Sequence, residues 1–341
     1  MVQMKSVVVT GPDSTAVLEV EHPAVGPADA LIRVRACGIC GSDAFYIHIG
    51  GIPPRQGATP IGHEIAGEIV EIGDDVVGLS LGDHVVVNPM AAPSGIIGNG
   101  GAKGGLSEFL LIEQAVVGRS VAIVPDHIPF EVAALNEPMA VARHAVNRAA
   151  PTPTDRVVIF GAGPIGLGAL IDLTLRGVES VVVIDVQPAR LAKALEIGAN
   201  AVIDSSTEDV AARLIELHGD APLRAGDHRP GTDIYIDAAG APAVIETVQR
   251  LAKHGARLSV VAVHKKPVEM DFGKILSSEL TITMSMGYPT EIFEVTQDII
   301  QAWERYAKII SDTVPFERVQ DALAFASTPG AAEKVVVTFP G

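Results

Sequence analysis

Two short segments in the first third of the chain carry residue types that bind transition metals. The segment CGICGSD contains Cys37 and Cys40, and the segment Gly62-His63-Glu64 follows it. A thiolate, an imidazole and a carboxylate are the ligand types of a catalytic zinc site that keeps one coordination position open. Cys40, His63 and Glu64 are therefore candidate zinc ligands.

Simpler interpretations of the same residues stay open on the residues alone. The C-G-I-C pair fits a redox motif, although no thioredoxin-like βαβ pattern surrounds it. Taken singly, Cys40 is more often a small core residue, and His63 a hydrogen-bonded loop histidine. A disulfide scaffold is excluded at this chain length, and two cysteines are too few for a four-cysteine structural zinc site.

A glycine-rich segment near the middle of the chain has the spacing of a dinucleotide site. The run 161–166, GAGPIG, follows the apolar segment Val157–Phe160 and opens a predicted helix. The first glycine allows the tight turn, the second lets the backbone approach a pyrophosphate, and the third packs helix on strand. The helix N-terminus offers amide donors to phosphate. The expected cofactor residues are Gly161, Gly163, Pro164, Ile165, Gly166 and Asp185.

Asp185 sets the expected choice of cofactor. It ends the strand that follows the glycine-rich helix, where a carboxylate accepts hydrogen bonds from the adenosine ribose. A negative charge at that position disfavours a 2′-phosphate, so the sequence predicts NAD rather than NADP. The simpler interpretation is a glycine-rich turn beside a surface aspartate.

The elements that must position these residues differ between the two parts of the chain. Residues 1–150 carry short apolar runs separated by Gly, Pro and Asp, which indicates an all-β, partly barrel-like unit. A helix is predicted near Phe130–Ala149, and the segment PTPTD at 151–155 marks the predicted domain junction. The strands predicted in this part are Lys5–Thr10, Ala30–Ala36, Glu64–Ile72, His84–Asn88 and Leu106–Ile112.

From Arg156 onward, predicted strands alternate with helices, which is the pattern of a doubly wound parallel sheet. Residues 219–231 are a predicted surface loop. A helix over Glu291–Tyr306 and a strand over Lys334–Phe339 are expected to rejoin the first domain. The fold is therefore predicted as α/β, with domains 1–150 plus 291–341, and 151–290. The remaining predicted elements are the strands Val157–Phe160, Val181–Asp185, Ala201–Ile203, Ile234–Ala238 and Leu258–Val263, with helices at Pro164–Arg176 and from Pro188.

Composition narrows the classes of partner. Hydrophobic residues make up 48% of the chain, but 34 Gly and 23 Pro interrupt them, and no run is long enough to span a membrane. The formal charge is 25 − 41 = −16, which argues against general nucleic-acid binding. The first residues lack a basic-then-apolar signal pattern, so a cytoplasmic protein is expected.

The same segments, read together, resemble the zinc signature of the medium-chain dehydrogenase/reductase superfamily. The matching features are CGICGSD, Gly62-His63-Glu64 with Gly67, Gly82-Asp83 before a strand, and NEPMAV at 136–141, followed by the nucleotide-binding pattern. The resemblance covers essentially the whole chain. It is strongest to the sorbitol (polyol) dehydrogenase branch, because Glu137-Pro138 occupies the later metal-site position. It implies a GroES-like catalytic domain split around a Rossmann domain, with one catalytic Zn²⁺ per subunit and NAD.

The resemblance also implies a role for each matching residue. Cys40 and His63 are zinc ligands, Glu64 is a direct or alternating ligand, and Glu137 is a ligand or holds a zinc-bound water. Asp43 accepts from the other ring nitrogen of His63. The remaining implied roles are proton transfer by Ser42, substrate contact by Tyr46, Glu137 and Tyr288, and cofactor contact by Arg190, which is otherwise an ordinary solvated helix residue.

Three departures from the family pattern shape the expected chemistry. The region Asn88–Gly105 has none of the cysteines that bind structural zinc in many relatives. Phe45 stands where many relatives have a relay histidine, which leaves Tyr46, His48 or water for proton exit. Gly287 replaces an arginine that precedes the pocket tyrosine of polyol dehydrogenases. Because long polyols then lack donors, a cyclic or branched secondary alcohol or a short diol is the expected substrate.

The predicted activity is hydride transfer between NAD and a secondary alcohol/ketone pair, by a homodimer or homotetramer without nucleic-acid or membrane partners. The alternatives are a zinc-free quinone or enone reductase of the same superfamily, an L-threonine 3-dehydrogenase-like enzyme, and a non-enzymatic nucleotide-binding protein. The Cys/His/Glu set argues against the zinc-free and non-enzymatic alternatives.

Overall fold

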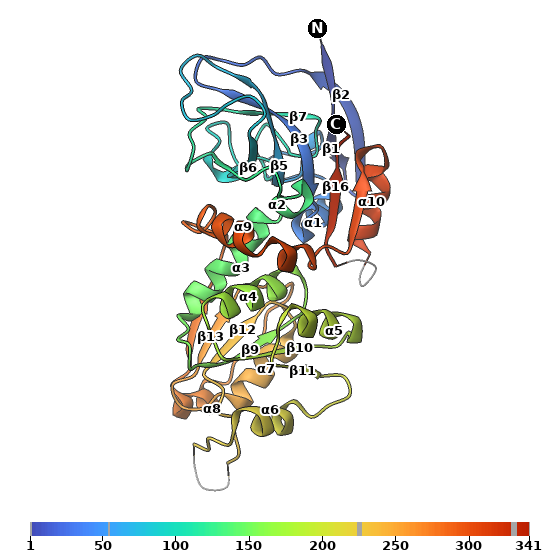
Figure 1. Cartoon of the computed structure of the whole chain (residues 1–341). Coiled ribbons are helices and arrows are strands. Elements are labelled where there is room, and N and C mark those ends of the chain that lie inside the picture. Colours follow the sequence, from blue (N-terminus) through green and yellow to red (C-terminus); the bar gives the residue numbers. More distant parts are fainter. Residues whose placement is uncertain (1, 54, 224–226, 329–332, 341) are drawn as a thin grey trace. The chain divides into compact units, whose positions relative to one another are not determined.

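The computed structural model describes residues 2–53, 55–223, 227–328 and 333–340 (Figure 1). Contacts within the chain divide it into two compact units. The first comprises Met1–Glu137 and Ile292–Gly341, and the second comprises Pro138–Glu291.

The first unit is built on two β-sheets, which are antiparallel except for one parallel pair. One sheet has the order β2-β1-β4, and the other has the order β15-β16-β3-β5-β6-β8 with β7 also paired to β3. The C-terminal strand β16 pairs with β3, so the last part of the chain completes a sheet that is formed mainly by strands from its first third. The strands are β1 (Gln3–Gly11), β2 (Ser14–Glu21), β3 (Ala30–Gly38), β4 (Thr59–Pro60), β5 (Glu64–Ile72), β6 (His84–Val87), β7 (Phe109–Ile112), β8 (Val121–Ile123), β15 (Asp312–Pro315) and β16 (Val335–Thr338).

One hydrophobic core lies within this unit. Ile32, Ile65, Leu106 and Val337 are buried together in it, although they are far apart in the sequence. The helices of the unit are short apart from α9. They are α1 (Gly41–Ile49), η1 (Pro89–Ala91), α2 (Phe130–Ala133), α9 (Glu294–Ala307), η3 (Phe316–Arg318) and α10 (Val319–Ser327).

The second unit is a six-stranded parallel sheet with the order β11-β10-β9-β12-β13-β14. The chain runs outward from β9 through β10 to β11, and then crosses to β12 on the other side of β9. A ligand of such a sheet binds outside the carboxyl ends of the strands, at the point where the order reverses. The strands are β9 (Arg156–Phe160), β10 (Ser180–Asp185), β11 (Ala201–Asp204), β12 (Ile234–Asp237), β13 (Arg257–Val260) and β14 (Thr281–Met284).

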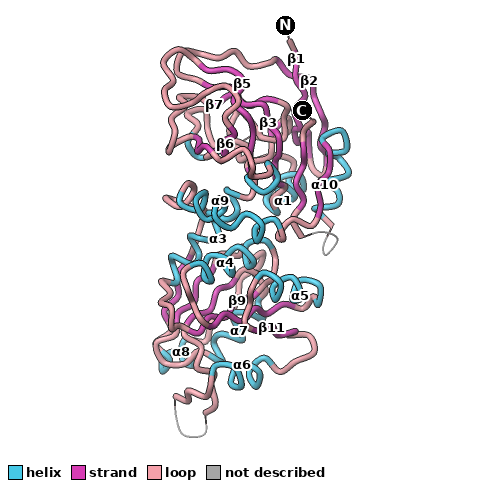
Figure 2. The backbone as a smooth tube through the Cα atoms, viewed as in Figure 1, coloured by secondary structure: helices cyan, strands magenta, loops and turns pink. Residues whose placement is uncertain are grey.

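Helices alternate with these strands, as Figure 2 shows for the second unit. The structure thus confirms the predicted combination of a β-rich unit with a doubly wound parallel sheet. The helices are α3 (Asn136–Ala149), α4 (Pro164–Leu175), α5 (Pro188–Ile197), α6 (Val210–His218), α7 (Pro242–Leu251), α8 (Phe272–Ile275) and η2 (Leu276–Ser278).

The boundary between the units falls after Glu137, earlier than the junction that the sequence predicts after residue 150. The reason lies in the packing of α3. Its Met139 is so close to Gly168 of α4 that a Cβ at Gly168 would lie 2.6 Å from the sulfur. In addition, Ser259 Oγ donates to the Ala145 carbonyl at 2.9 Å. From Pro138 onward, helix α3 is therefore part of the second unit.

Several predicted elements change their bounds. Helix 130–149 is divided into α2 and α3, because Pro138 fits only the first turn of a helix. Strand β2 was not predicted; most of its side chains are exposed, and none is fully buried. The predicted strand over Leu106–Ile112 begins at Phe109 instead, because the Leu106 amide is bonded to Ile61.

Two further predictions concern a surface loop and membrane-spanning segments. The predicted surface loop 219–231 includes residues 224–226, which lie outside the described residues; the flanking part is joined by a bridge between Asp220 and Pro230. None of the helices in the described segments combines the length and the apolar character that a membrane crossing requires.

Candidate active site

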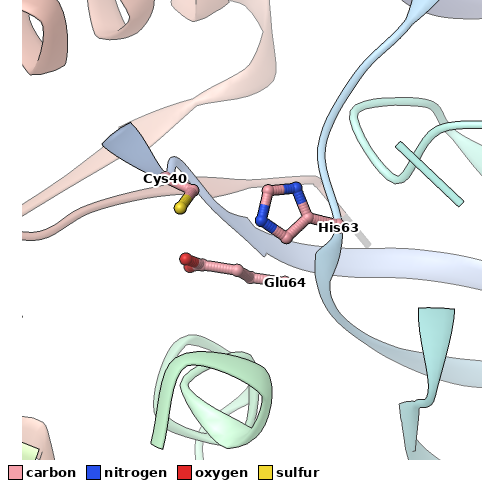
Figure 3. A group of neighbouring side chains, drawn as sticks. All are labelled: Cys40, His63 and Glu64. Carbon is pink, nitrogen blue, oxygen red and sulfur yellow. The ribbon is translucent and has the colours of Figure 1, made fainter. Parts of the chain in front are cut away.

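The three candidate zinc ligands converge where β3 and β5 pair and α1 begins. Antiparallel pairing sets Gly38 opposite Glu64, and Cys40 lies just beyond Gly38 as the N-cap of α1. One ligand atom from each of Cys40, His63 and Glu64 lies within 4.8 Å of the others (Figure 3). The strand register thus brings together two segments that are separate in the sequence.

This cluster has the properties of a zinc site. His63 and Glu64 are buried, and Glu64 Oε1 makes no hydrogen bond within the described residues. A buried polar atom normally has a hydrogen-bond partner, and a bound cation would take the place of that partner for Glu64 Oε1. Thiolate, imidazole and carboxylate are also zinc's usual ligands. The donor set and its burial therefore fit a Zn²⁺ ion.

Asp43 joins the two ligand-bearing segments. Its buried carboxylate accepts from the Cys40 amide at 2.9 Å and from the Gly62 amide at 3.3 Å. Asp43 Oδ1 lies 3.7 Å from His63 Nδ1, which is an ion-pair distance rather than a hydrogen bond. Asp43 is thus beside the ring nitrogen that the resemblance assigns to it, and it acts there through its charge.

The charges of the cluster alter the pKa values of its members. Burial lowers the pKa of His63, but the negative charge of Asp43 and the contact with Cys40 outweigh it, so the pKa lies well above 6.5. Burial raises the pKa of Asp43, and the nearby His63 opposes that rise. Because zinc binds the neutral imidazole, metal binding competes with protonation of His63.

Lys334 is a residue of this site that the sequence analysis missed. Only 4% of its side chain is exposed, and its ammonium group forms an ion pair with Glu64 Oε2 and donates to the Ile39 carbonyl at 3.1 Å. Burial lowers the pKa of Lys334, but the charge of Glu64 outweighs it and the pKa is raised. The signal in the sequence was a lysine directly before the apolar run 335–337.

Gly38 is required by the same arrangement. The Glu64 side chain crosses directly over it, and any Cβ at that position would overlap the Glu64 carboxylate. A substitution at Gly38 is therefore expected to displace a candidate ligand.

Glu137 lies in the first turn of α3 and is buried. Its negative charge contributes to raising the pKa values of His63 and Lys334, so it lies within electrostatic range of the cluster. It is not among the three residues whose ligand atoms lie within 4.8 Å of one another. Of its two implied roles, holding a water beside the metal fits this position better.

Helix α1 carries the implied proton-transfer and substrate residues. Ser42 is partly buried in its first turn, and Phe45 is 55% exposed. The Tyr46 hydroxyl donates to Asn99 at 2.7 Å, and burial raises the pKa of Tyr46. Asn99 belongs to the region Asn88–Gly105, which the sequence analysis had considered only for its missing cysteines.

His48, an alternative proton acceptor in the sequence analysis, is engaged elsewhere. Its Nδ1 atom hydrogen bonds with Asp13 at 3.0 Å on an exposed surface. Ser42 and Tyr46 therefore remain the polar side chains of α1 that are partly buried near the cluster.

In the second unit, the glycine-rich turn has the conformation that its motif predicts. Gly161 adopts φ +98°, which favours glycine, and Gly163 is the N-cap of α4. A Cβ at Gly166 would overlap the Gly161 carbonyl oxygen, so the third glycine is needed for the close contact of helix and turn.

Asp185, the expected ribose-binding residue, holds this turn together. Its carboxylate accepts from the amides of Ala162 at 2.7 Å, Val186 at 2.7 Å and Gln187 at 3.0 Å. A carboxylate has about four acceptor positions, so one remains for a ribose hydroxyl. The turn-holding role could not be read from the motif.

The other residues implied by the resemblance also lie in the second unit. Arg190 is in the first turn of α5, and its buried Nε atom makes no hydrogen bond within the described part of the chain. Tyr288 is buried, and Gly287 before it adopts φ +64° with open space where a Cβ would lie.

Known families match both units. Residues 26–123 match the alcohol dehydrogenase GroES-like domain, and residues 164–311 match the zinc-binding dehydrogenase domain. The (R,R)-butanediol dehydrogenase of Bacillus subtilis is 30% identical over 292 residues, which cover 79% of this chain and 80% of that protein. The chain belongs to the zinc-dependent medium-chain dehydrogenase family. The resemblance read from the motifs is confirmed.

Other members of the family match over nearly the full length. Sorbitol dehydrogenase of Bombyx mori is 27% identical, with 99% of each chain covered. Among solved structures, a short chain alcohol dehydrogenase of Escherichia coli in complex with NADH superposes with a TM-score of 0.82 at 27% identity and 99% coverage of both chains. As a member of the zinc-dependent medium-chain dehydrogenase family, the chain whose structure is described above is an oxidoreductase that uses zinc and NAD.

Proposed function

We propose that the protein oxidises a short diol, or a cyclic or branched secondary alcohol, to the ketone, and catalyses the reverse reduction. The observation that carries this proposal is the cluster of Cys40, His63 and Glu64, whose ligand atoms lie within 4.8 Å of one another and of which His63 and Glu64 are buried. A relative that is 30% identical is a butanediol dehydrogenase, which supports a small diol as substrate.

The proposed site residues have separate roles in metal binding and proton transfer. When bound, zinc supplies Lewis acidity to the substrate oxygen, and NAD accepts the hydride. Cys40, His63 and Glu64 hold the metal. Ser42 Oγ takes the hydroxyl proton and passes it to solvent, while Glu137 holds a water beside the cluster.

The substrate proposal follows from the small number of free hydrogen-bond donors among the implied substrate residues. The Tyr46 hydroxyl already donates its proton to Asn99, and Gly287 has no side chain that could donate. An unpaired buried hydroxyl costs roughly 1–3 kcal/mol, so a hexitol with many hydroxyls is disfavoured. A screen with NAD tests this: a short diol or cyclic alcohol should give the highest kcat/KM. A higher value for sorbitol, xylitol or L-threonine would overturn the proposal.

We also propose that the protein forms a homodimer or a homotetramer. Light scattering on the purified protein tests this, and a monomer would contradict it.

Asp185→Asn is expected to raise the NADP-to-NAD ratio of kcat/KM by roughly 10–100-fold, because removing one charge relieves repulsion of the 2′-phosphate across a few ångströms. Asparagine keeps a carbonyl acceptor for the Val186 and Gln187 amides, so the turn is retained. Asp185→Ala is the comparison, since it loses those bonds as well. Wild-type protein that prefers NADP would show the ribose argument to be wrong.

Phe45→His is expected to accelerate proton release where that step limits turnover. General acid–base groups typically contribute about 10²–10⁴-fold when proton transfer limits, and an exposed position on α1 tolerates the change. The solvent isotope effect on kcat is the measurement, with Phe45→Gln as the non-titrating control. An unchanged isotope effect would mean that water already carries the proton.

A further inference from the structure

A buried histidine–aspartate pair lies at the carboxyl edge of the parallel sheet, outside the residues discussed so far. Asp237 ends β12 and is fully buried, and His264 follows β13 in the next turn. His264 Nε2 donates to Asp237 Oδ2 at 2.7 Å. The imidazole is 17% exposed, so the pair is largely shielded from water.

Asp237 also organises the two turns around it. Its other carboxylate oxygen accepts from the amides of Ala239 at 3.0 Å and Gly240 at 2.9 Å. Its carbonyl oxygen accepts from the amides of Val261 and Ala262, which follow β13. The turn after β13 is therefore attached to Asp237 both by its backbone and by the His264 side chain.

These turns lie directly beside the glycine-rich turn. The Ala238 amide donates to the Phe160 carbonyl at 2.9 Å, and a Cβ at Gly161 would lie 3.0 Å from the Ala238 backbone. On the other side, a Cβ at Gly240 would lie 2.9 Å from the Val263 carbonyl oxygen. Three successive turns thus pack along one edge of the sheet.

The strand order assigns this edge to one half of the dinucleotide. Asp185 ends β10 on one side of β9, while Asp237 and His264 lie beyond β12 and β13 on the other. A dinucleotide straddles such a switch point. With the adenosine ribose at Asp185, the nicotinamide half lies over the turns that Asp237 and His264 hold.

One side chain in these turns is apolar and nevertheless exposed to solvent. Val263 directly precedes His264 and is 79% exposed, although it is apolar. We propose that His264 is a positioning residue for the nicotinamide half of NAD: through Asp237 it fixes the turn that presents Val263 as an apolar wall to the nicotinamide ring. This inference rests on the use of NAD in the proposed function.

The role assigned to His264 is indirect. Its Nδ1 atom is buried and makes no hydrogen bond within the described residues, and its Nε2 atom is bonded to Asp237, so neither ring nitrogen is available to a ligand. Its effect on the cofactor must pass through the position of the turn.

The test compares NADH with ADP-ribose, which lacks the nicotinamide, by calorimetric titration of the full chain. His264→Ala should raise the Kd of NADH roughly tenfold, the effect of losing a hydrogen bond to a charged group, and leave the Kd of ADP-ribose unchanged. His264→Gln, whose amide can donate to Asp237, should recover most of the NADH affinity.

His218→Ala is the matched control. His218 is a buried histidine of the same unit, and it hydrogen bonds with Thr232, which precedes β12 at the opposite edge of the sheet. It should lower thermal stability without changing either Kd. Should His264→Ala fail to fold, Val263→Ser tests the same wall at an exposed position and should weaken NADH alone.

The outcomes separate this inference from the proposed function. Equal weakening of NADH and ADP-ribose by His264→Ala, or no weakening of NADH by Val263→Ser, would overturn the inference and leave the activity in place. Wild-type protein that binds neither compound would overturn the NAD assignment, and this inference with it.

Discussion

Cys40→Ser is expected to remove bound zinc and to lower kcat/KM by at least ~10³-fold, because a catalytic zinc contributes several kcal/mol of transition-state stabilisation. A serine hydroxyl does not replace a thiolate as a zinc ligand at neutral pH. The affinity for NADH should remain unchanged, since the dinucleotide residues belong to the other unit of the chain. Zinc content by elemental analysis, turnover and NADH titration are the three measurements.

Cys37→Ser is the matched control for this prediction. Burial raises the pKa of the Cys37 thiol well above its usual value, and its Sγ atom lies in the hydrophobic core rather than in the metal cluster. A thiol of this kind is unreactive, so Cys37→Ser should keep zinc and activity at some cost in stability. Equal loss of activity in both variants would favour the redox interpretation of the C-G-I-C pair.

The same elemental analysis also tests the zinc content of the wild-type protein. The described residues hold one cluster of three potential ligands, and the sequence has no cysteines in the region 88–105. One zinc per chain is therefore expected, and two zincs per chain would contradict the assignment of a single catalytic site.

Lys334→Met is expected to destabilise the metal-depleted protein by about 3–5 kcal/mol, the usual cost of leaving one partner of a buried ion pair without the other. The Glu64 carboxylate is fully buried and would lose the ammonium group that pairs with it. Urea unfolding monitored by circular dichroism measures the change. Addition of zinc should recover part of the loss, because the metal supplies a positive charge to the same carboxylate.

A double-mutant cycle isolates the interaction. Glu64→Gln combined with Lys334→Met should recover most of the stability, since no unpaired charge then remains. Lys274→Met is the surface control, because Lys274 pairs with Asp271 at an exposed position where such pairs contribute about 0–1 kcal/mol. A loss at Lys334 no larger than that at Lys274 would show that the buried pair has no structural role.

The dinucleotide site is the part of the molecule that the sequence alone determined most fully. The conformation of the turn 161–166 depends on glycines within a few residues of one another, and the acidic residue ends the next strand of the same βαβ unit. Interactions of such short sequence separation can be read from spacing, and so could the alternation of strands and helices from residue 156 onward.

The metal cluster is an intermediate case. The ligand types of Cys40, His63 and Glu64 could be read from the sequence together with the family resemblance. Their convergence depends on the antiparallel register of β3 and β5, which sets Gly38 opposite Glu64. A register of this kind follows from burial across the whole sheet, and no local pattern specifies it.

Only the tertiary structure revealed the residues that support the two sites. Lys334 reaches Glu64 from the last strand of the chain, because β16 pairs with β3. His264 reaches Asp237 because β12 and β13 are neighbours in the parallel sheet. In both pairs the partners are far apart in sequence and meet only after the strands have been ordered by packing, so the residues around each one do not identify its partner.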